Sequence, residues 1–174
     1  CSYSRRKESY TRFLPTKKIR TMSFLYDTLV QEFGKREIAR VPVPNYITDN
    51  LKTGFGQRPY QIESFQRYIL CHNEDFEGRP KKPFHLLYNM ATGSGKTLVM
   101  AGLMLYLYEK GFRNFLFFVN SNNIIKKTKD NFLNPQASKY LFNDKIVIDG
   151  KEVYIKETDT FESADDKNIN IKFT

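Results

Sequence analysis

The sequence predicts an α/β fold with a doubly wound parallel sheet, because three features follow one another along the chain. A short apolar run suits a buried parallel strand, and a glycine-rich turn comes directly after it. A strongly apolar helix follows the turn, and a second apolar run and a further helix complete a β-loop-α-β-α pattern. In chain order these predicted elements are residues 83–89, 91–95, 97–110, 113–120 and 121–133.

Two helices are expected upstream of this unit. Apolar residues at helical spacing predict a helix over residues 22–33, with Gly34 as its stop. A Val-Pro-Val-Pro connector and a short helix around residues 46–51 come next. The second main helix opens at Arg58-Pro-Tyr-Gln61, because proline is accepted at the first position of a helix. A polar loop over residues 72–83 then leads to the first strand.

The region after Pro135 has a different character. Residues 145–156 alternate between apolar and polar around Asp149-Gly150, which predicts a β-hairpin. Residues 159–168 are polar and loop-like, and the alternation of residues 169–173 indicates another strand of the core sheet. The hairpin is therefore expected as an insertion, at about residues 144–157, within the parallel sheet.

Composition excludes several classes of protein. The 174 residues are 40% apolar and 27% charged, with 15 Phe and 11 Tyr, which is typical of a globular chain and not of a disordered one. The longest apolar stretch, residues 98–108, is shorter than the roughly 20 residues that span a membrane. Two cysteines cannot form a disulfide scaffold, and without a secretory signal pattern they indicate a cytoplasmic setting.

The positive charge is concentrated at the start of the chain. The net charge is +9, and residues 1–20 hold seven basic residues against one acid. Such an excess is expected of a nucleic-acid binder, and it is equally expected of a solvated arm. We therefore describe residues 1–54 as a basic arm and helical lead-in, and residues 55–174 as the main domain.

The most specific motif is a phosphate-binding loop at Met90-Ala-Thr-Gly-Ser-Gly-Lys-Thr97. Glycines let successive backbone N–H groups surround a phosphate, and the following helix presents its positive end to the same anion. Lys96 would reach the β- and γ-phosphates, and the Thr97 hydroxyl would ligate Mg²⁺ held with ATP. The one departure is Met90, where the general pattern has glycine. The expected ATP-binding residues in this loop are Thr92, Gly93, Ser94, Gly95, Lys96 and Thr97.

These residues resemble motif I of superfamily-2 helicases, and the Met-Ala-Thr-Gly start resembles the motor subunits of type III and, less closely, type I restriction enzymes. Arg58-Pro-Tyr-Gln61 is similar to the RPYQ element that serves as a Q-motif there. Residues 117–125 look like motif Ia, and residues 171–174 look like the approach to motif Ib. The resemblance covers residues 55–133 well.

The resemblance implies a partial RecA-like P-loop domain and roles for named residues. Gln61 would hydrogen-bond the adenine edge, and Arg58 would brace that site or the phosphates; helix capping and solvation are the alternatives. Motif Ia would contact the backbone of one nucleic-acid strand. Its expected contacts are Ser121, Asn122, Asn123 and Lys126, which begin a helix where short polar side chains suit phosphate oxygens.

A complete motor of this family also has an acidic DExx box, which helps to hold Mg²⁺ and to orient the attacking water, and a second motor lobe. No apolar run ending in Asp-Glu follows the P-loop in this chain. We therefore expect residues 55–174 to be an incomplete first motor domain that does not hydrolyse ATP alone. The resemblance implies that the parent is the restriction subunit of a type III system, which translocates along double-stranded DNA and pairs with a modification methyltransferase subunit.

Three other interpretations stay open. The chain could belong to another superfamily-2 DNA or RNA helicase, which only domains beyond residue 174 would distinguish. A small P-loop kinase would need a lid with arginines, but Arg113 is the only arginine after Lys96. A non-catalytic nucleic-acid-binding module would depend on the basic arm and would bind DNA without nucleotide dependence.

Overall fold

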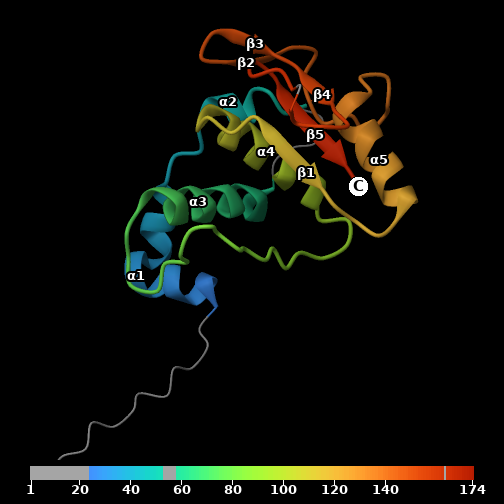
Figure 1. Cartoon of the computed structure of the whole chain (residues 1–174). Helices are drawn as coiled ribbons and strands as arrows, with labels where there is room; N and C mark the ends of the chain where they lie inside the picture. Colours follow the sequence, from blue (N-terminus) through green and yellow to red (C-terminus); the bar gives the residue numbers. More distant parts are fainter. Residues whose placement is uncertain (1–23, 53–57, 163) are drawn as a thin grey trace, which may run out of the picture.

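A computed structural model describes residues 24–52, 58–162 and 164–174 (Figure 1). The expected arm at residues 1–20 and the predicted helix start at Met22 lie outside these ranges. The helices are α1 (Leu25–Arg40), α2 (Asn45–Thr48), α3 (Pro59–Asn73), α4 (Lys96–Glu109) and α5 (Asn122–Leu133). The strands are β1 (Asn114–Phe117), β2 (Ile146–Ile148), β3 (Lys151–Val153), β4 (Ile155–Glu157) and β5 (Ile169–Phe173).

The α/β class with a parallel sheet is confirmed. Strands β1, β5 and β4 form a three-stranded sheet in that order, and both pairings are parallel. The central strand β5 is the most buried, since Ile169 and Ile171 are at most 3% exposed. Helix α5 packs against β4, and α4 leads into β1 through a short link at residues 110–113 (Figure 1).

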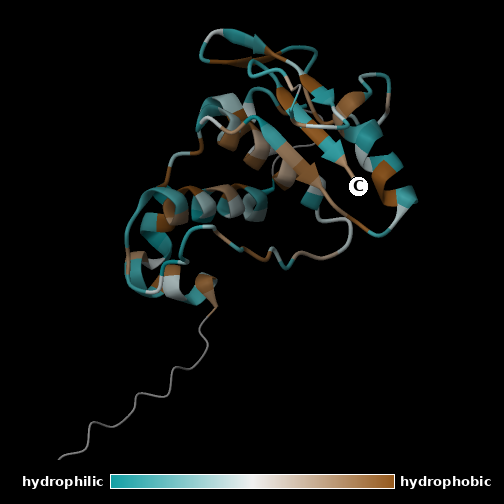
Figure 2. Ribbon diagram, viewed as in Figure 1, coloured by the Kyte–Doolittle hydropathy of each residue, from teal (hydrophilic) through white to brown (hydrophobic). Residues whose placement is uncertain are grey.

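Helix α4 is buried by the helices before it and by the core of the sheet. It contacts both α2 and α3, and its buried residues include Leu98, Leu105 and Tyr106. Gly102 makes the close approach possible, because a Cβ there would lie 2.5 Å from Cζ of Phe65 and 3.1 Å from Cγ2 of Ile47. Helix α5 differs from α4, because it has one solvated face. Figure 2 shows both hydrophobic and polar residues along α5.

The predicted strand at residues 83–89 is wrong. Residues 84–90 are extended, and their exposure alternates along the chain, with Phe84 and Tyr88 half-buried and Leu87 93% exposed. That is the side-chain pattern of a strand. Nothing in the described ranges pairs with this segment, however, and a strand requires hydrogen bonds to a neighbouring strand. The apolar run therefore predicted the backbone conformation but not the pairing.

The predicted hairpin is confirmed in its turn but is shorter than expected. Strands β2 and β3 pair in antiparallel fashion around Asp149 and Gly150, whose φ angles of 51° and 73° fit a two-residue hairpin turn. The expected range of 144–157 runs too far, because β4 leaves the hairpin and pairs with β5 in the main sheet. The chain thus returns to the core sheet after a single residue, Tyr154, between β3 and β4.

A buried asparagine attaches the hairpin to the α2 region. Asn50 is 3% exposed, and its amide nitrogen donates to the carbonyls of Tyr46 (2.6 Å) and Val147 (2.8 Å). Its amide oxygen accepts from the Val147 N–H at 2.8 Å. The side chain therefore bonds both backbone groups of one hairpin residue, as a neighbouring strand would.

The helical lead-in follows the prediction with one difference. At Gly34 the φ of 76° breaks α1 where a stop was expected, but the helix resumes and ends only at Arg40. Helix α2 is shorter than the expected 46–51. Helix α3 begins at Pro59 as predicted, and it packs against α1.

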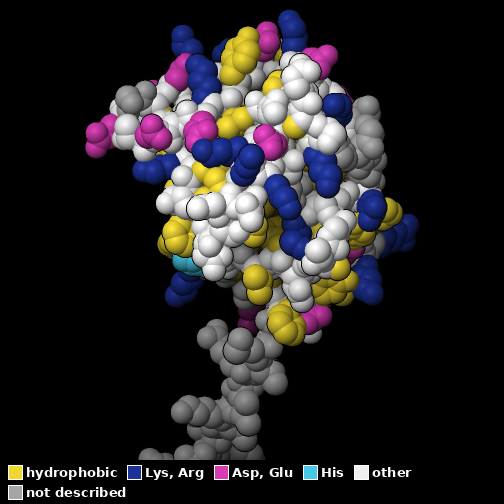
Figure 3. Space-filling view, turned by 90° about the vertical axis from the view of Figure 1, so that its right-hand side faces the viewer, with side chains coloured by type: hydrophobic (Ala, Val, Ile, Leu, Met, Phe, Trp, Pro, Cys, Tyr) yellow, Lys and Arg dark blue, Asp and Glu magenta, His cyan; other side chains and the backbone are white. Residues whose placement is uncertain are grey.

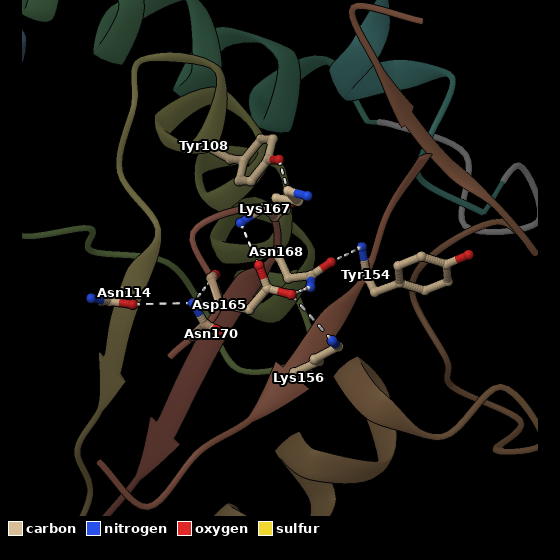
Figure 4. A network of polar contacts seen from close by, with 8 residues as sticks. All are labelled: Tyr108, Asn114, Tyr154, Lys156, Asp165, Lys167, Asn168 and Asn170. Atoms are coloured by element: carbon tan, nitrogen blue, oxygen red, sulfur yellow. Dashed lines mark hydrogen bonds and ion pairs between the residues drawn. The ribbon is translucent and has the colours of Figure 1, made fainter. Parts of the chain in front are cut away.

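A polar network holds the amino ends of the three parallel strands together (Figure 4). The Asp165 carboxylate accepts from the backbone N–H of Lys167 (2.7 Å) and from the side-chain amide of Asn168 (2.6 Å). Asn168 in turn accepts from the N–H of Tyr154, just before β4. Asn170 donates to Asn114 of β1 at 3.1 Å. The loop before β5 is thereby tied to both neighbouring strands.

We expect Gly102→Ala to destabilise the protein by up to about 2 kcal/mol. Alanine improves helix propensity by roughly 1 kcal/mol, but overpacking against Phe65 and Ile47 costs about 1–3 kcal/mol. Urea denaturation would measure the change. Gly102→Ala should lower the free energy of unfolding less in a Phe65→Leu background than in the wild type, because the smaller side chain leaves room for the new methyl group. An equal loss in both backgrounds would contradict this packing.

We expect Asp165→Asn to lower the melting temperature at neutral pH, because the new amide would face the Asn168 donor. The Lys167 N–H, together with Lys156 and Asn168, lowers the pKa of Asp165. A lowered pKa means that the carboxylate stabilises the fold above its unfolded pKa of about 3.9 and stops doing so as pH falls through the folded value.

The difference in melting temperature between the wild type and Asp165→Asn should therefore become smaller as the pH is lowered from 7 to 3. Asp166→Asn is the matched control, since the Asp166 side chain makes no hydrogen bond or ion pair with the described residues. If the difference in melting temperature does not change with pH, the Asp165 carboxylate does not stabilise the fold through this network.

Candidate functional site

The loop at residues 90–97 connects the extended segment 84–90 to α4. Gly93 and Gly95 adopt φ angles of 77° and 81°, which side chains with a Cβ rarely allow. Gly95 caps α4, and its carbonyl accepts the N–H groups of Leu98 and Val99. The N–H groups of Lys96 and Thr97 lie in the first turn, where they have no partner within the helix. This end of α4 is therefore suited to an anion.

Lys96 reaches back across the loop. Its Nζ donates to the carbonyls of Met90 (3.0 Å) and Ala91 (2.9 Å), and the Ser94 hydroxyl donates to the same Ala91 carbonyl at 2.6 Å. Lys96 as a whole is an exposed residue. A phosphate bound to the N–H groups of this loop would meet a cation already in place.

The departure at Met90 does not disturb the loop. Its backbone carbonyl binds Lys96, and its side chain is half-buried against the hydrophobic core. No positive φ is recorded at this residue. Position 90 therefore does not require glycine in this chain.

Gln61 lies directly against the loop. It is 3% exposed, its Oε1 accepts the N–H of Arg58 at 2.9 Å, and its Nε2 donates to the Ser94 carbonyl at 2.9 Å. A Cβ on Gly95 would lie 2.3 Å from this Nε2, so the contact depends on glycine. The structure thus joins Arg58, Gln61 and the P-loop, and it shows the capping contact; the adenine contact remains a prediction.

Sequence reasoning missed Tyr60, which lies between these two residues. Its hydroxyl donates to the Ser94 carbonyl at 2.9 Å and accepts from Nη1 of Arg58 at 3.1 Å. The signal was present, because Tyr60 is part of the same four-residue element. The predicted adenine contact involved only the side chains of Gln61 and Arg58.

The second group of expected residues lies at the start of α5. Ser121 caps the helix without a side-chain hydrogen bond, and Asn122, Asn123 and Lys126 are exposed. Lys129 differs, because it forms an ion pair with Glu157 of β4. Helix α5 follows the carboxyl end of β1. The carboxyl end of α4 leads into the amino end of β1, and the loop at residues 90–97 lies at the other end of α4. Both groups therefore lie toward the carboxyl edge of the sheet.

The remaining ionisable groups near α3 do not suggest chemistry. Burial raises the pKa of the Cys71 thiol, with Arg79 partly opposing, and burial raises the pKa of Tyr88. Both groups are therefore protonated at neutral pH. Among residues 24–52, 58–162 and 164–174, no cluster of three His, Cys, Asp or Glu residues could hold a metal ion. No helix in these ranges is long and apolar enough to cross a membrane.

Comparison with known proteins gives a consistent result. Residues 54–174 match the family described as type III restriction enzyme, res subunit. The chain is 42% identical over 136 residues to the probable type III restriction-modification enzyme HindVIP Res subunit of Haemophilus influenzae. This alignment covers 76% of the chain and 26% of that relative. No solved structure matches the chain.

Proposed function

Because this chain belongs to the type III restriction enzyme Res subunit family, we propose that it is the ATP-binding part of a DNA-translocating motor. The observation that carries the proposal is the loop at residues 90–97. This loop combines two glycines with positive φ, the amino end of α4 and a lysine whose ammonium group folds back onto the loop. That combination is suited to the β- and γ-phosphates of a nucleotide.

The residues present also fit Mg²⁺ carried with ATP. Thr97 begins α4 beside Lys96, so its hydroxyl is the expected ligand, as in other P-loops. The metal ion would neutralise charge on the phosphates. Within this chain, Lys96 and the loop N–H groups hold the phosphates, and Arg58 and Gln61 are proposed to hold the base.

The start of α5 is the proposed contact with DNA. Ser121, Asn122 and Asn123 offer short polar side chains and helix N–H groups, which suit backbone phosphates and carry no base specificity. Lys126 adds an exposed positive charge one turn further along. Figure 3 views the side of the molecule that includes α5, and it shows Lys and Arg side chains across the middle of this face.

The chain spans about a quarter of the relative that it matches, so the activity of the whole protein is proposed for a longer parent. That parent would supply the DExx box, the second motor lobe and the nuclease, and would act in the cytoplasm with a modification methyltransferase subunit on double-stranded DNA. We propose that this chain alone binds ATP without hydrolysing it. Further strands of the parent would pair with residues 84–90.

We expect Lys96→Ala to weaken ATP binding about 10- to 100-fold, because hydrogen bonds to a charged group contribute about 1.5–3 kcal/mol. Titration calorimetry with MgATP would measure the affinity. Lys110→Ala at the opposite end of α4 is the matched control, since that lysine pairs with Glu109 on the surface. Steady ATP turnover by this chain, lost in Lys96→Ala, would contradict the proposed inactivity.

We expect Lys126→Ala to weaken DNA binding equally for unrelated sequences and to reduce the salt slope of log K by about 1, as one lost phosphate contact does. Fluorescence anisotropy with labelled duplexes at several salt concentrations would measure both. Lys139→Ala, an exposed lysine beyond the other end of α5, is the control. An unchanged slope in Lys126→Ala would place the DNA elsewhere.

A further inference from the structure

Two side chains from the first turn of α3 donate to one carbonyl of the P-loop. The Tyr60 hydroxyl and Gln61 Nε2 both lie 2.9 Å from the Ser94 oxygen. A carbonyl oxygen has two lone pairs, so these donors use its full capacity. The Ser94 carbonyl is therefore fixed in direction toward α3.

Fixing this carbonyl also fixes the next N–H group. The Ser94–Gly95 peptide is trans, so its N–H points away from its C=O and hence away from α3. The Gly95 N–H has no hydrogen-bond partner in the described part of the chain. It is thus a free donor in the loop that would surround a phosphate.

Arg58 sets the direction of the tyrosine proton. Its Nη1 donates to the Tyr60 hydroxyl, which occupies an oxygen lone pair and leaves the hydroxyl hydrogen to point at Ser94. The tyrosine is 39% exposed, so this contact is not sealed from water. Gln61 lies close against Gly95, since a Cβ on that glycine would lie 2.3 Å from Nε2.

We propose that Tyr60 is a positioning residue of the nucleotide site, which aims the Gly95 N–H at the bound phosphates by holding the Ser94 carbonyl. This inference rests on the proposed function, because it presumes that the loop binds a nucleotide. It assigns Tyr60 to phosphate binding, although the residue belongs to the element from which a base contact is expected.

The test compares ligands with and without a base. Tyr60→Phe removes only the hydroxyl, and affinities for MgATP and for inorganic tripolyphosphate would be measured by titration calorimetry on the purified protein. One hydrogen bond of ordinary net strength corresponds to a loss of about three- to tenfold. We expect both ligands to weaken by the same factor within this range, since the lost contact acts on the phosphates alone.

Tyr108→Phe is the matched control. It also removes a tyrosine hydroxyl that donates to a backbone carbonyl, that of Lys167 at 2.7 Å, near the amino edge of the sheet. Melting curves would confirm that both variants are folded. We expect Tyr108→Phe to bind both ligands with wild-type affinity.

Three results would overturn the proposal. Weaker ATP binding with unchanged tripolyphosphate binding would assign Tyr60 to the base, and unchanged binding of both would remove it from the site. An equal loss in Tyr108→Phe would indicate a general effect on the fold. If the wild type and Lys96→Ala alike bind neither ligand, the proposed function itself is wrong, and this inference falls with it.

Discussion

The burial of α4 is the constraint on which the rest of the structure depends. This helix contacts α2 and α3, and its other buried residues share one core with β5 and the hairpin. Its amino end forms the P-loop and its carboxyl end leads into β1. A shift of α4 would therefore displace the proposed phosphate site and the sheet together. The absence of a side chain at Gly102 is what lets Phe65 reach this helix.

The two edges of the parallel sheet serve different purposes. At the amino edge, Asp165, Asn168 and Asn170 satisfy one another and the adjacent backbone, so this edge is closed by internal hydrogen bonds. Toward the carboxyl edge, the side chains of Asn122 and Asn123 form no such hydrogen bonds with the described residues. Parallel α/β sheets commonly bind ligands outside the carboxyl ends of their strands. The hydrogen-bond network and the proposed ligand contacts thus lie at opposite ends of the same strands.

The sequence predicted the features that depend on local chemistry. The structure has three features that follow from residue types at short spacing: the glycine turn before α4, the start of α3 at Pro59 and the Asp149-Gly150 turn. The prediction of a strand at residues 83–89 was wrong because strand pairing depends on residues remote in the chain. The Tyr60 contact is a different case, because Tyr60 belongs to the Arg58-Pro-Tyr-Gln61 element that the sequence analysis singled out, although its partner Ser94 lies 34 residues away.

The hydrogen bonds that Lys96 makes within the loop affect the free energy of the proposed nucleotide binding. Its ammonium group already makes two hydrogen bonds to loop carbonyls, so in the proposed complex a phosphate would replace Met90 and Ala91 as its partner. The affinity then measures the difference between two sets of bonds to the same cation, and not the strength of the new set alone. In return, the side chain has already lost much of its rotamer entropy, which amounts to up to about 2 kcal/mol for lysine. On binding, the ammonium group would exchange two neutral carbonyl oxygens for anionic phosphate oxygens.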